Sequence, residues 1–313
     1  MTVLLVGNYF GHEFDALATA VRERGTEAVT VDTDEWPSER PLTLDPGAGS
    51  LTVDGTTLSV DDVTGVFVRH NGLFVPAIRD YTDGVVSEDD NPYAALTQLR
   101  EYRGLFRSLL RTVDAAGGTV FPGLDGLRWQ ETSVAACCRL GEAGLPVPPS
   151  LATSDTAAAR AFLERHERVV CKPVAEFGGV KALTAADADV LEGLTTPVFL
   201  QALVPGDDVR CYVLDGEFLG AFEYVSDVEG FSFKTGDEHP DAVPADLSAA
   251  AVADVREAVA VSPMRYAAVD LRVDGGDHTV LEVNAGGRFA LADRSGVTDV
   301  TDALADALVS DAG

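Results

Sequence analysis

One stretch near the C-terminus, residues 266–288, constrains the fold more than any other part of the sequence. It reads YAAVDLRVDGGDHTVLEVNAGGR, with an apolar run on each side of a Gly-Gly pair. Two such runs around a glycine turn predict a β-hairpin. Because side chains alternate along a strand, Glu282 and Asn284 share one of its faces. If residues 275–277 form a three-residue loop, Asp270 lies directly across from Glu282 on that face.

The polar face of this hairpin has the composition of a magnesium site. Two carboxylates opposed at about 5 Å repel each other unless a positive group lies between them. Asp270, Glu282 and the amide oxygen of Asn284 are hard oxygen ligands, which Mg²⁺ prefers while it holds substrate phosphates. The alternative is a half-exposed hairpin whose acidic face is only solvated, and the stretch taken alone does not decide between the two.

The composition of the whole chain limits its class and its partners. The sequence has 313 residues, 46% of them hydrophobic, which is enough for a core divided over two or three lobes. Acidic residues number 51 against 23 basic ones, and the formal net charge is −28. This charge argues against nucleic acid as a partner, because binding to a phosphate backbone needs a basic surface. It is typical of proteins in a high-salt cytoplasm, where salt screens self-repulsion, so we expect a halophilic source.

The sequence shows no targeting or membrane segment. Residues 1–10, MTVLLVGNYF, lack the basic start and the cleavage site of a signal peptide. No apolar run is as long as the roughly 18 residues that a membrane helix needs. The cysteines form no C-x-x-C pair, so we expect reduced thiols in a cytoplasmic protein. They are Cys137, Cys138, Cys171 and Cys211.

Alternating strand and helix patterns predict an α/β N-terminal domain followed by two α+β lobes. The predicted division is an N-terminal domain over residues 1–125, a small lobe over residues 126–205 and a C-terminal lobe over residues 206–313. Strands are predicted at residues 3–6, 28–31, 51–53, 57–60, 66–68, 169–174, 180–183, 198–204, 209–214 and 217–225, besides the hairpin. Helices are predicted at residues 13–24, 92–115, 131–143, 154–166, 246–260 and 298–309, with a short one between residues 183 and 198.

Lys172 is an unusual residue in its local sequence. It lies within VVCKPV, an apolar strand pattern over residues 169–174, and it is one of only three lysines in the chain. A lysine in such a strand must find a partner or reach a cavity. The glycine pair Gly178-Gly179 follows, and the amides of a glycine turn can approach phosphate. The alternative is a lysine that extends to solvent, followed by an ordinary turn.

Two further segments carry polar groups that suit a nucleotide. The buried strand pattern FLQALV over residues 199–204 offers backbone groups for a flat base edge, and Asp208 and Arg210 share a face of the next strand. These two form either a cross-strand ion pair or separate contacts to a ribose and to a phosphate or carboxylate. Lys234 lies in the polar segment FSFKT, and a mobile cation can close over developing phosphate charge. A plain surface lysine is its alternative.

In this order, the pieces resemble the motif series of the ATP-grasp superfamily. The series is K-P in a strand, a glycine turn, a Q-x-x-V strand, D-V-R, and then D…E-V-N. Within the superfamily the chain most resembles RimK-type glutamate ligases and the graspetide, or microviridin-type, peptide macrocyclases. The resemblance covers residues 126–313, and the N-terminal domain, including Arg69, looks like the matching pre-ATP-grasp domain. The combination is specific, whereas each motif alone is not.

The resemblance implies an ATP-grasp fold and a role for each matching residue. Nucleotide contacts are implied for Lys172 at the phosphates, Asp208 at the ribose, and Gly178, Gly179, Gln201, Ala202, Leu203 and Val204. Catalytic roles at the transferred phosphoryl group are implied for Arg210 and Lys234. Asp270, Glu282 and Asn284 would hold Mg²⁺ or Mn²⁺. Arg69 and Arg288 are candidates for binding the substrate carboxylate, with a structural ion pair as the equal alternative for Arg69.

The sequence departs from the family in three places. A second nucleotide-binding lysine is expected near Ser133, where the sequence WQETSV has none, so ATP affinity is weaker or Arg128 substitutes. Ala202 stands where an acidic residue is common. After Asn284 the chain continues Ala-Gly-Gly-Arg, without the Ser-Ser-Pro of RimK-type enzymes, which implies a different acceptor site.

These observations favour an ATP-dependent ligase that activates a carboxylate as an acyl phosphate and joins it to an amine or a hydroxyl. The substrate expected is a small molecule, an amino acid or a peptide, with no nucleic acid and no membrane, and a homodimer or homotetramer is expected. A catalytically weak ATP-binding or peptide-binding pseudo-ligase is the first alternative, motivated by the absent lysine. A phosphotransferase, which would release no acyl phosphate, is the weaker one.

Overall fold

The computed structural model describes residues 1–7, 13–32, 41–53, 55–69, 92–174, 180–192, 194–225 and 241–310. The chain forms two units. The first unit consists of Met1–Leu124, Ala285–Asp293 and Asp299–Gly313, and the second of Asp125–Asn284 and Arg294–Thr298. The first boundary lies one residue from the predicted one at 125. The C-terminal residues differ from our expectation, because most of the chain after Asn284 belongs to the first unit. A further division near residue 205 stays a prediction.

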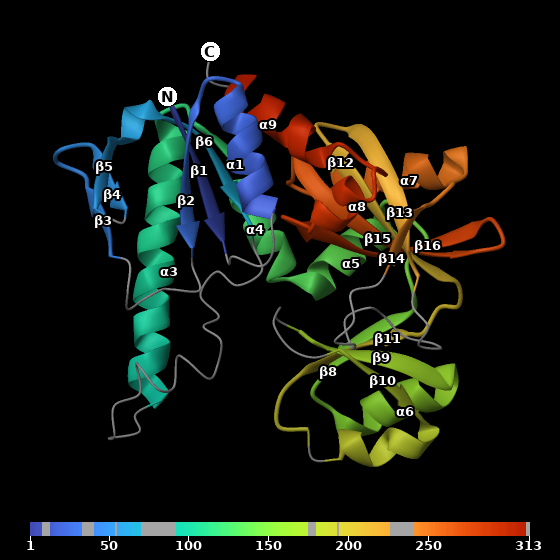
Figure 1. Cartoon of the computed structure of the whole chain (residues 1–313). Coiled ribbons are helices and arrows are strands. Elements are labelled where there is room, and N and C mark those ends of the chain that lie inside the picture. Colours follow the sequence, from blue (N-terminus) through green and yellow to red (C-terminus); the bar gives the residue numbers. More distant parts are fainter. Residues whose placement is uncertain are drawn as a thin grey trace. The chain divides into compact units, whose positions relative to one another are not determined.

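The first unit is built on a parallel four-stranded sheet in the order β2-β1-β6-β7. The chain runs from β1 through α1 to β2 on one side, and from β6 through α3 to β7 on the other. Right-handed crossovers in opposite directions place α1 and α3 on opposite faces of the sheet, as Figure 1 shows, with α9 beside α1. The bounds are β1 Thr2–Gly7, α1 Glu13–Glu23, β2 Glu27–Asp32, β6 Val63–Val68, α3 Pro92–Ala115, β7 Thr119–Phe121 and α9 Val300–Ser310.

The core of this unit follows from the apolar strand β1. Its residues Val3–Val6 are fully buried, as expected for a central parallel strand that is covered on both faces. Phe67 stacks edge-on against Phe14 and Phe289, with ring centroids 6.3 and 6.2 Å away. The predicted hairpin over residues 51–60 forms part of a second, antiparallel sheet. Its strands are β3 Leu42–Asp45, β4 Ser50–Val53 and β5 Thr56–Ser59.

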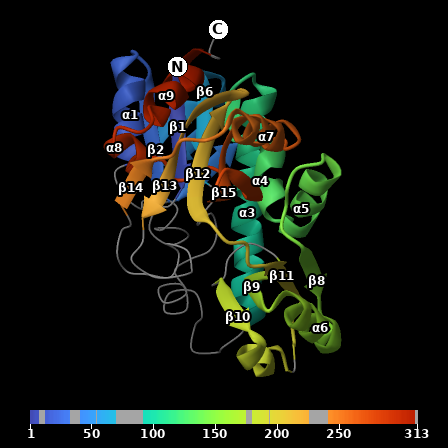
Figure 2. The same cartoon turned by 90° about the vertical axis from the view of Figure 1, so that its right-hand side faces the viewer.

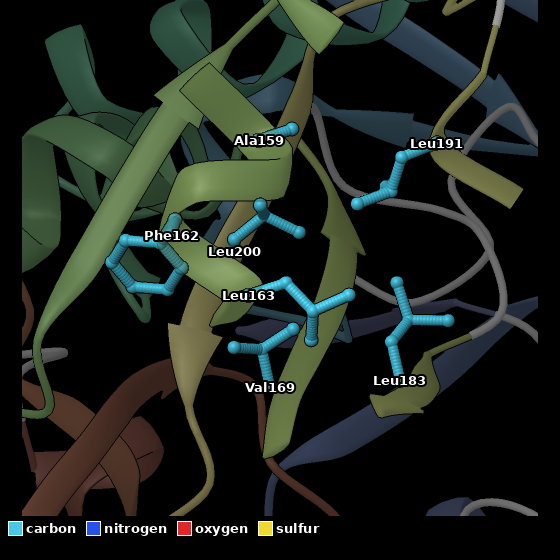
Figure 3. Close-up of a cluster of buried hydrophobic side chains, with 7 residues drawn as sticks. All are labelled: Ala159, Phe162, Leu163, Val169, Leu183, Leu191 and Leu200. Atoms are coloured by element: carbon cyan, nitrogen blue, oxygen red, sulfur yellow. The ribbon is translucent and has the colours of Figure 1, made fainter. Parts of the chain in front are cut away.

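The second unit contains two antiparallel sheets. The smaller has the order β10-β9-β11-β8, and α6 and η2 pack on it. Seven residues, among them Leu163 and Leu200, form its apolar core (Figure 3). The bounds are β8 Ser150–Thr153, α6 Thr156–His166, β9 Arg168–Pro173, β10 Lys181–Thr184, η2 Ala185–Leu191 and β11 Val198–Ala202. Asp155, rather than the predicted Ser154, caps α6, because its carboxylate accepts the amide proton of Ala157.

The larger sheet has the order β14-β13-β12-β15-β16, and α7 packs against β12, β13 and β15 (Figure 2). Its bounds are β12 Asp207–Leu214, β13 Glu217–Val225, β14 Asp241–Pro244, α7 Ala249–Ala260, β15 Tyr266–Asp274 and β16 Asp277–Ala285. Two short helices precede the smaller sheet, α4 Leu124–Gln130 and α5 Ser133–Glu142, and α8 Ala290–Arg294 follows β16. Within the part of the chain that the structure describes, no helix is both long and apolar enough to cross a membrane.

The predicted hairpin is present, but its loop is shorter than the three residues considered. β16 begins at Asp277, so the turn is Gly275-Gly276 alone, with φ values of +57° and +105°. Such a left-handed conformation strains any residue with a β-carbon, which explains why both positions are glycine. The three-residue loop therefore does not account for the approach of Asp270 to Glu282. That approach is seen instead in the side-chain contacts described next.

Candidate active site

A pocket in the second unit encloses about 650 Å³ of empty space, part of it open to solvent. Strands β9 and β11 of the smaller sheet and β12, β13, β15 and β16 of the larger one contribute to its walls. Eight predicted site residues line it: Lys172, Gln201, Ala202, Leu203, Val204, Asp208, Asp270 and Glu282. Concave sites with apolar walls and a few polar groups are typical of small-ligand binding. The fold thus brings together residues that are up to 110 positions apart in the sequence.

The apolar end of the pocket presents backbone groups after β11. The amide of Ala202 donates to the carbonyl of Pro149 at 2.9 Å, and the amide of Leu203 donates to the carbonyl of Arg168 at 3.0 Å. These two amides are engaged within the protein. The carbonyls of the segment and the amide of Val204 therefore remain the candidates for reading a base edge.

Gln201 is held in one orientation by a serine that the sequence did not single out. Its side chain is buried, and its Nε2 donates to Oγ of Ser150 at 3.2 Å. The hydroxyl of Ser150 gives its proton to the carbonyl of Pro148 at 2.8 Å, so it can only accept from Gln201. Cys137 also contacts Ser150, at 3.7 Å, and burial raises the pKa of its thiol. The arrangement turns the amide nitrogen of Gln201 toward Ser150.

Arg210 and Asp270 form a buried ion pair. They are direct neighbours on β12 and β15, and Nε and Nη2 of Arg210 bond the two carboxylate oxygens at 2.7 and 2.8 Å. The guanidinium also lies 5.8 Å from the ring centre of Tyr224. Burial would lower the pKa of Arg210, but the charge of Asp270 raises it, and the net pKa lies well above its usual range. Of the two interpretations of Arg210, the cross-strand ion pair is therefore present, although its partner is Asp270.

Lys172 and Glu282 form a looser pair beside it. Nζ of Lys172 lies 3.5 Å from Oε2 of Glu282, and the two side chains are 19% and 29% exposed. The lysine of β9 thus reaches the cavity, which is the functional interpretation of its position. Together with Arg210, it places one protein cation against each of the two predicted metal-binding carboxylates.

Asn284 joins the two carboxylates. Its Nδ2 donates to Oδ2 of Asp270 at 3.0 Å and to Oε1 of Glu282 at 3.3 Å. Its Oδ1 accepts from Nε2 of Gln130 at 3.1 Å. The three predicted metal ligands therefore converge, although the convergence is made here by an amide donor.

The donor set fits a hard divalent cation. Two carboxylates and an amide oxygen are oxygen ligands of the kind that Mg²⁺ takes with waters and phosphates. Each carboxylate oxygen has a second lone pair besides the one that its partner uses. Across the described ranges, no group of three or more His, Cys, Asp and Glu side chains is placed to hold a metal. This set, with its asparagine, remains our candidate for an ion.

Arg272 was missed from the sequence. Its Nε lies 3.2 Å from Oδ1 of Asp208, and its Nη1 donates to the carbonyl of Gly206 at 2.6 Å. It lines the pocket and is the direct cross-strand neighbour of Asp208. Alternation from Asp270 places it on the polar face of the hairpin, so this signal was present in the sequence.

The two candidate substrate-binding arginines belong to the first unit. Arg69 is only 2% exposed, and its Nη1 lies 2.8 Å from Oε2 of Glu13. Oε1 of Glu13 accepts the amide protons of Phe289 and Ala290, both at 2.9 Å. This is the arrangement of the structural alternative for Arg69. Arg288 is exposed, and its role stays a prediction.

Three predicted site residues, Gly178, Gly179 and Lys234, lie outside the described residues. Their assignment to phosphate contacts and to the transferred phosphoryl group stays a prediction.

A family model described as an ATP-grasp domain, the third family of its clade, matches residues 76–308. The chain belongs to this ATP-grasp family. The match spans most of the sequence, so the resemblance inferred from the motif series is confirmed. The predicted ATP-grasp fold, with its mixture of α/β and α+β parts, is confirmed as well.

Solved ATP-grasp proteins resemble the chain over nearly its whole length. The ligase PsnB, solved with a minimal precursor, Mg and ADP, is 28% identical with a TM-score of 0.75, and the match covers 99% of this chain and 97% of PsnB. The macrocyclase MdnC from Microcystis aeruginosa, bound with its precursor peptide MdnA, is 21% identical with a TM-score of 0.79, over 99% and 100% of the two chains. A RimK domain ATP-grasp protein from Sphaerobacter thermophilus is 20% identical with a TM-score of 0.64, over 99% and 100%. A search of curated proteins gave no match.

Proposed function

We propose that this ATP-grasp protein is an ATP-dependent ligase that activates a carboxylate as an acyl phosphate and joins it to an amine or a hydroxyl. A carboxylate is a poor electrophile. Transfer of the γ-phosphoryl group of ATP to one of its oxygens creates a good leaving group, and the attacking amine or hydroxyl then displaces phosphate. ADP and phosphate are the other products.

The observation that carries this proposal is the meeting of cations and carboxylates at one pocket. Lys172 and Arg210 lie against Glu282 and Asp270, respectively, at 3.5 and 2.7 Å. Phosphoryl transfer depends mainly on positioning and on neutralising the charge of the phosphates. A bound Mg²⁺ or Mn²⁺ would supply further positive charge. In a chain with 51 acidic residues, such a cluster of positive charge has a specific use.

The proposed roles of the residues follow from their places in the pocket. Asp270, Glu282 and Asn284 would hold the metal ion, and Lys172 would leave Glu282 to contact the phosphates. The carbonyl oxygen of Gln201 would accept a proton from the amino group of adenine, because its nitrogen is bonded to Ser150. Asp208, held by Arg272, would accept from the ribose hydroxyls.

A peptide is the substrate that we propose. PsnB and MdnC are both solved with precursor peptides. PsnB is 28% identical over nearly the whole of both chains, which supports a related substrate class. The carboxylate would then belong to an aspartate or glutamate side chain, and the acceptor to a lysine or to a serine or threonine.

The test is ADP release from Mg-ATP in molar KCl, with hydroxylamine present and pools of acidic peptides as substrate. We expect ADP release that depends on the peptide, together with a peptide hydroxamate, because hydroxylamine traps an acyl phosphate. A phosphopeptide without hydroxamate would identify a phosphotransferase instead. Tight ATP binding with no turnover across peptide and amino-acid pools would point to a pseudo-ligase and overturn the proposal.

A further inference from the structure

Gln130, the last residue of α4, is a buried polar residue that the proposed reaction has not used. It is 8% exposed. Its Nε2 donates to Oδ1 of Asn284 at 3.1 Å, across 154 residues of sequence. A buried amide costs free energy unless its hydrogen bonds are made. A glutamine at this place therefore needs a partner there, and that partner is a proposed metal ligand.

The network around Asn284 permits one orientation of its amide. Asp270 and Glu282 are carboxylates that only accept hydrogen bonds, and both accept from Nδ2 of Asn284. An Asn284 turned by half a rotation would place its oxygen against two acceptors. The donor on the far side, Gln130, completes the orientation because it bonds the oxygen of Asn284.

Metal ligation requires the opposite orientation. Asn284 ligates through Oδ1, so its nitrogen would then face Gln130. Gln130 carries a donor and an acceptor on one amide, so a half rotation of that amide presents its oxygen to the asparagine nitrogen. Glutamine can therefore satisfy Asn284 in both orientations, whereas an apolar side chain satisfies neither and a carboxylate only the metal-binding one.

We propose that Gln130 is a positioning residue for Asn284, and that its amide turns together with that of Asn284 when the metal site fills. This inference rests on the proposed function, because it takes Asn284 as a metal ligand. A glutamine that merely ties α4 to β16 would have no influence on how tightly the ion binds. Partners that orient metal ligands typically change metal affinity by about 10- to 100-fold when they are removed.

The test measures Mn²⁺ affinity in the presence of the ATP analogue AMPPNP, from the free Mn²⁺ signal in electron paramagnetic resonance. The variants are Gln130→Met and Gln130→Glu, each also made in an Asn284→Ala background. We expect Gln130→Met to weaken Mn²⁺ binding by about ten-fold or more, and to have no such effect when Asn284 is absent. Gln130→Glu should bind at least as tightly as wild type, and the part of its effect that persists without Asn284 measures added charge alone.

Each result separates the inference from a structural role. An equal loss in both backgrounds, or unchanged Mn²⁺ affinity in Gln130→Met, overturns it. Wild-type protein that binds AMPPNP but no Mn²⁺ overturns the proposed metal site and the inference together. Wild-type binding with an indifferent Gln130 overturns the inference alone. If Gln130→Met does not melt cooperatively, Gln130→Asn replaces it, since this variant keeps the amide but is one methylene too short to reach Asn284.

Discussion

Arg210 and Asp270 face each other across β12 and β15 and exchange two hydrogen bonds of 2.7 and 2.8 Å in a buried place. Lys172 and Glu282 meet at 3.5 Å and are more exposed. The site thus has a fixed half, where a rigid guanidinium fork matches a carboxylate, and an adjustable half, where a flexible lysine can change partner. A metal ion that joins the site would displace little in the first half and release a cation in the second.

Loss of Asp270 should destabilise the protein. Asp270→Ala leaves the buried Arg210 charge without its carboxylate, and breaking a buried ion pair in this way costs about 3–5 kcal/mol. Urea unfolding followed by circular dichroism measures the free energy of unfolding. We expect a lower midpoint than in wild type and little change in the slope.

The double variant Arg210→Met, Asp270→Leu is the control for this prediction. It removes both charges and keeps apolar volume, so most of the lost stability should return. An Asp270→Ala protein as stable as wild type would mean that the pair is not desolvated in solution.

Loss of the Glu282 charge should abolish turnover while the fold is kept. Glu282→Gln removes one of two carboxylates at the proposed metal site, but its partially exposed partner Lys172 can turn to solvent. We expect ADP release to fall at least about 100-fold, the upper range for a metal-site partner, with an unchanged circular dichroism spectrum.

Asp254→Asn is the matched control for Glu282→Gln. Asp254 on α7 is a carboxylate paired with His278 at 2.8 Å, outside the pocket residues, and it undergoes the same chemical change. Its turnover should equal that of wild type. Full activity of Glu282→Gln would remove Glu282 from the metal site.

Much of the fold was predictable because its signals are local. The apolar run of β1, the glycine after α1 and the Gly275-Gly276 turn each act over a few residues, and the elements lie where they were predicted. Short elements such as β7 and β8 were missed, because three or four residues carry too little periodicity. The return of the C-terminal helix α9 to the first unit was also missed, since it depends on contacts far apart in sequence.

The site was predictable where motif residues share a strand face, and unpredictable where partners come from other elements. Asp208 and Asp270 were inferred from their strands and do line the pocket. Gln130 and Ser150 were not, because nothing in WQETSV or PPS indicates that one side chain reaches Asn284 and the other Gln201. Long-range hydrogen bonds of this kind arise only from tertiary packing.

Arg272 should affect nucleotide affinity more than the rate of the bound complex. It holds Asp208 at 3.2 Å, so Arg272→Gln frees the carboxylate that is proposed to bind the ribose. We expect the KM for ATP to rise about ten-fold, the effect of one charged hydrogen bond, with kcat within about two-fold of wild type. Steady-state ADP release at saturating peptide measures both constants.

Arg265→Gln serves as the comparison for Arg272→Gln. Arg265 bonds Asp215 at 2.7 Å in a similar arginine–aspartate pair, but at an exposed turn outside the pocket residues. Its KM for ATP should not change. A fall in kcat without a change in KM for Arg272→Gln would instead place Arg272 at the transferred group.

Salt should stabilise this protein strongly. Its formal net charge of −28 makes the folded state repel itself, and the Debye length falls from about 10 Å to about 3 Å between 0.1 M and 1 M salt. We expect Tm to rise by more than about 4 °C between low-salt buffer and molar KCl, which corresponds to more than about 1 kcal/mol for a chain of this size. Differential scanning calorimetry with KCl and with NaCl, and with sucrose as an uncharged control, separates screening from general exclusion effects. Similar rises in both salts with a smaller one in sucrose support screening, whereas a Tm that does not move with KCl would contradict the expected adaptation to high salt.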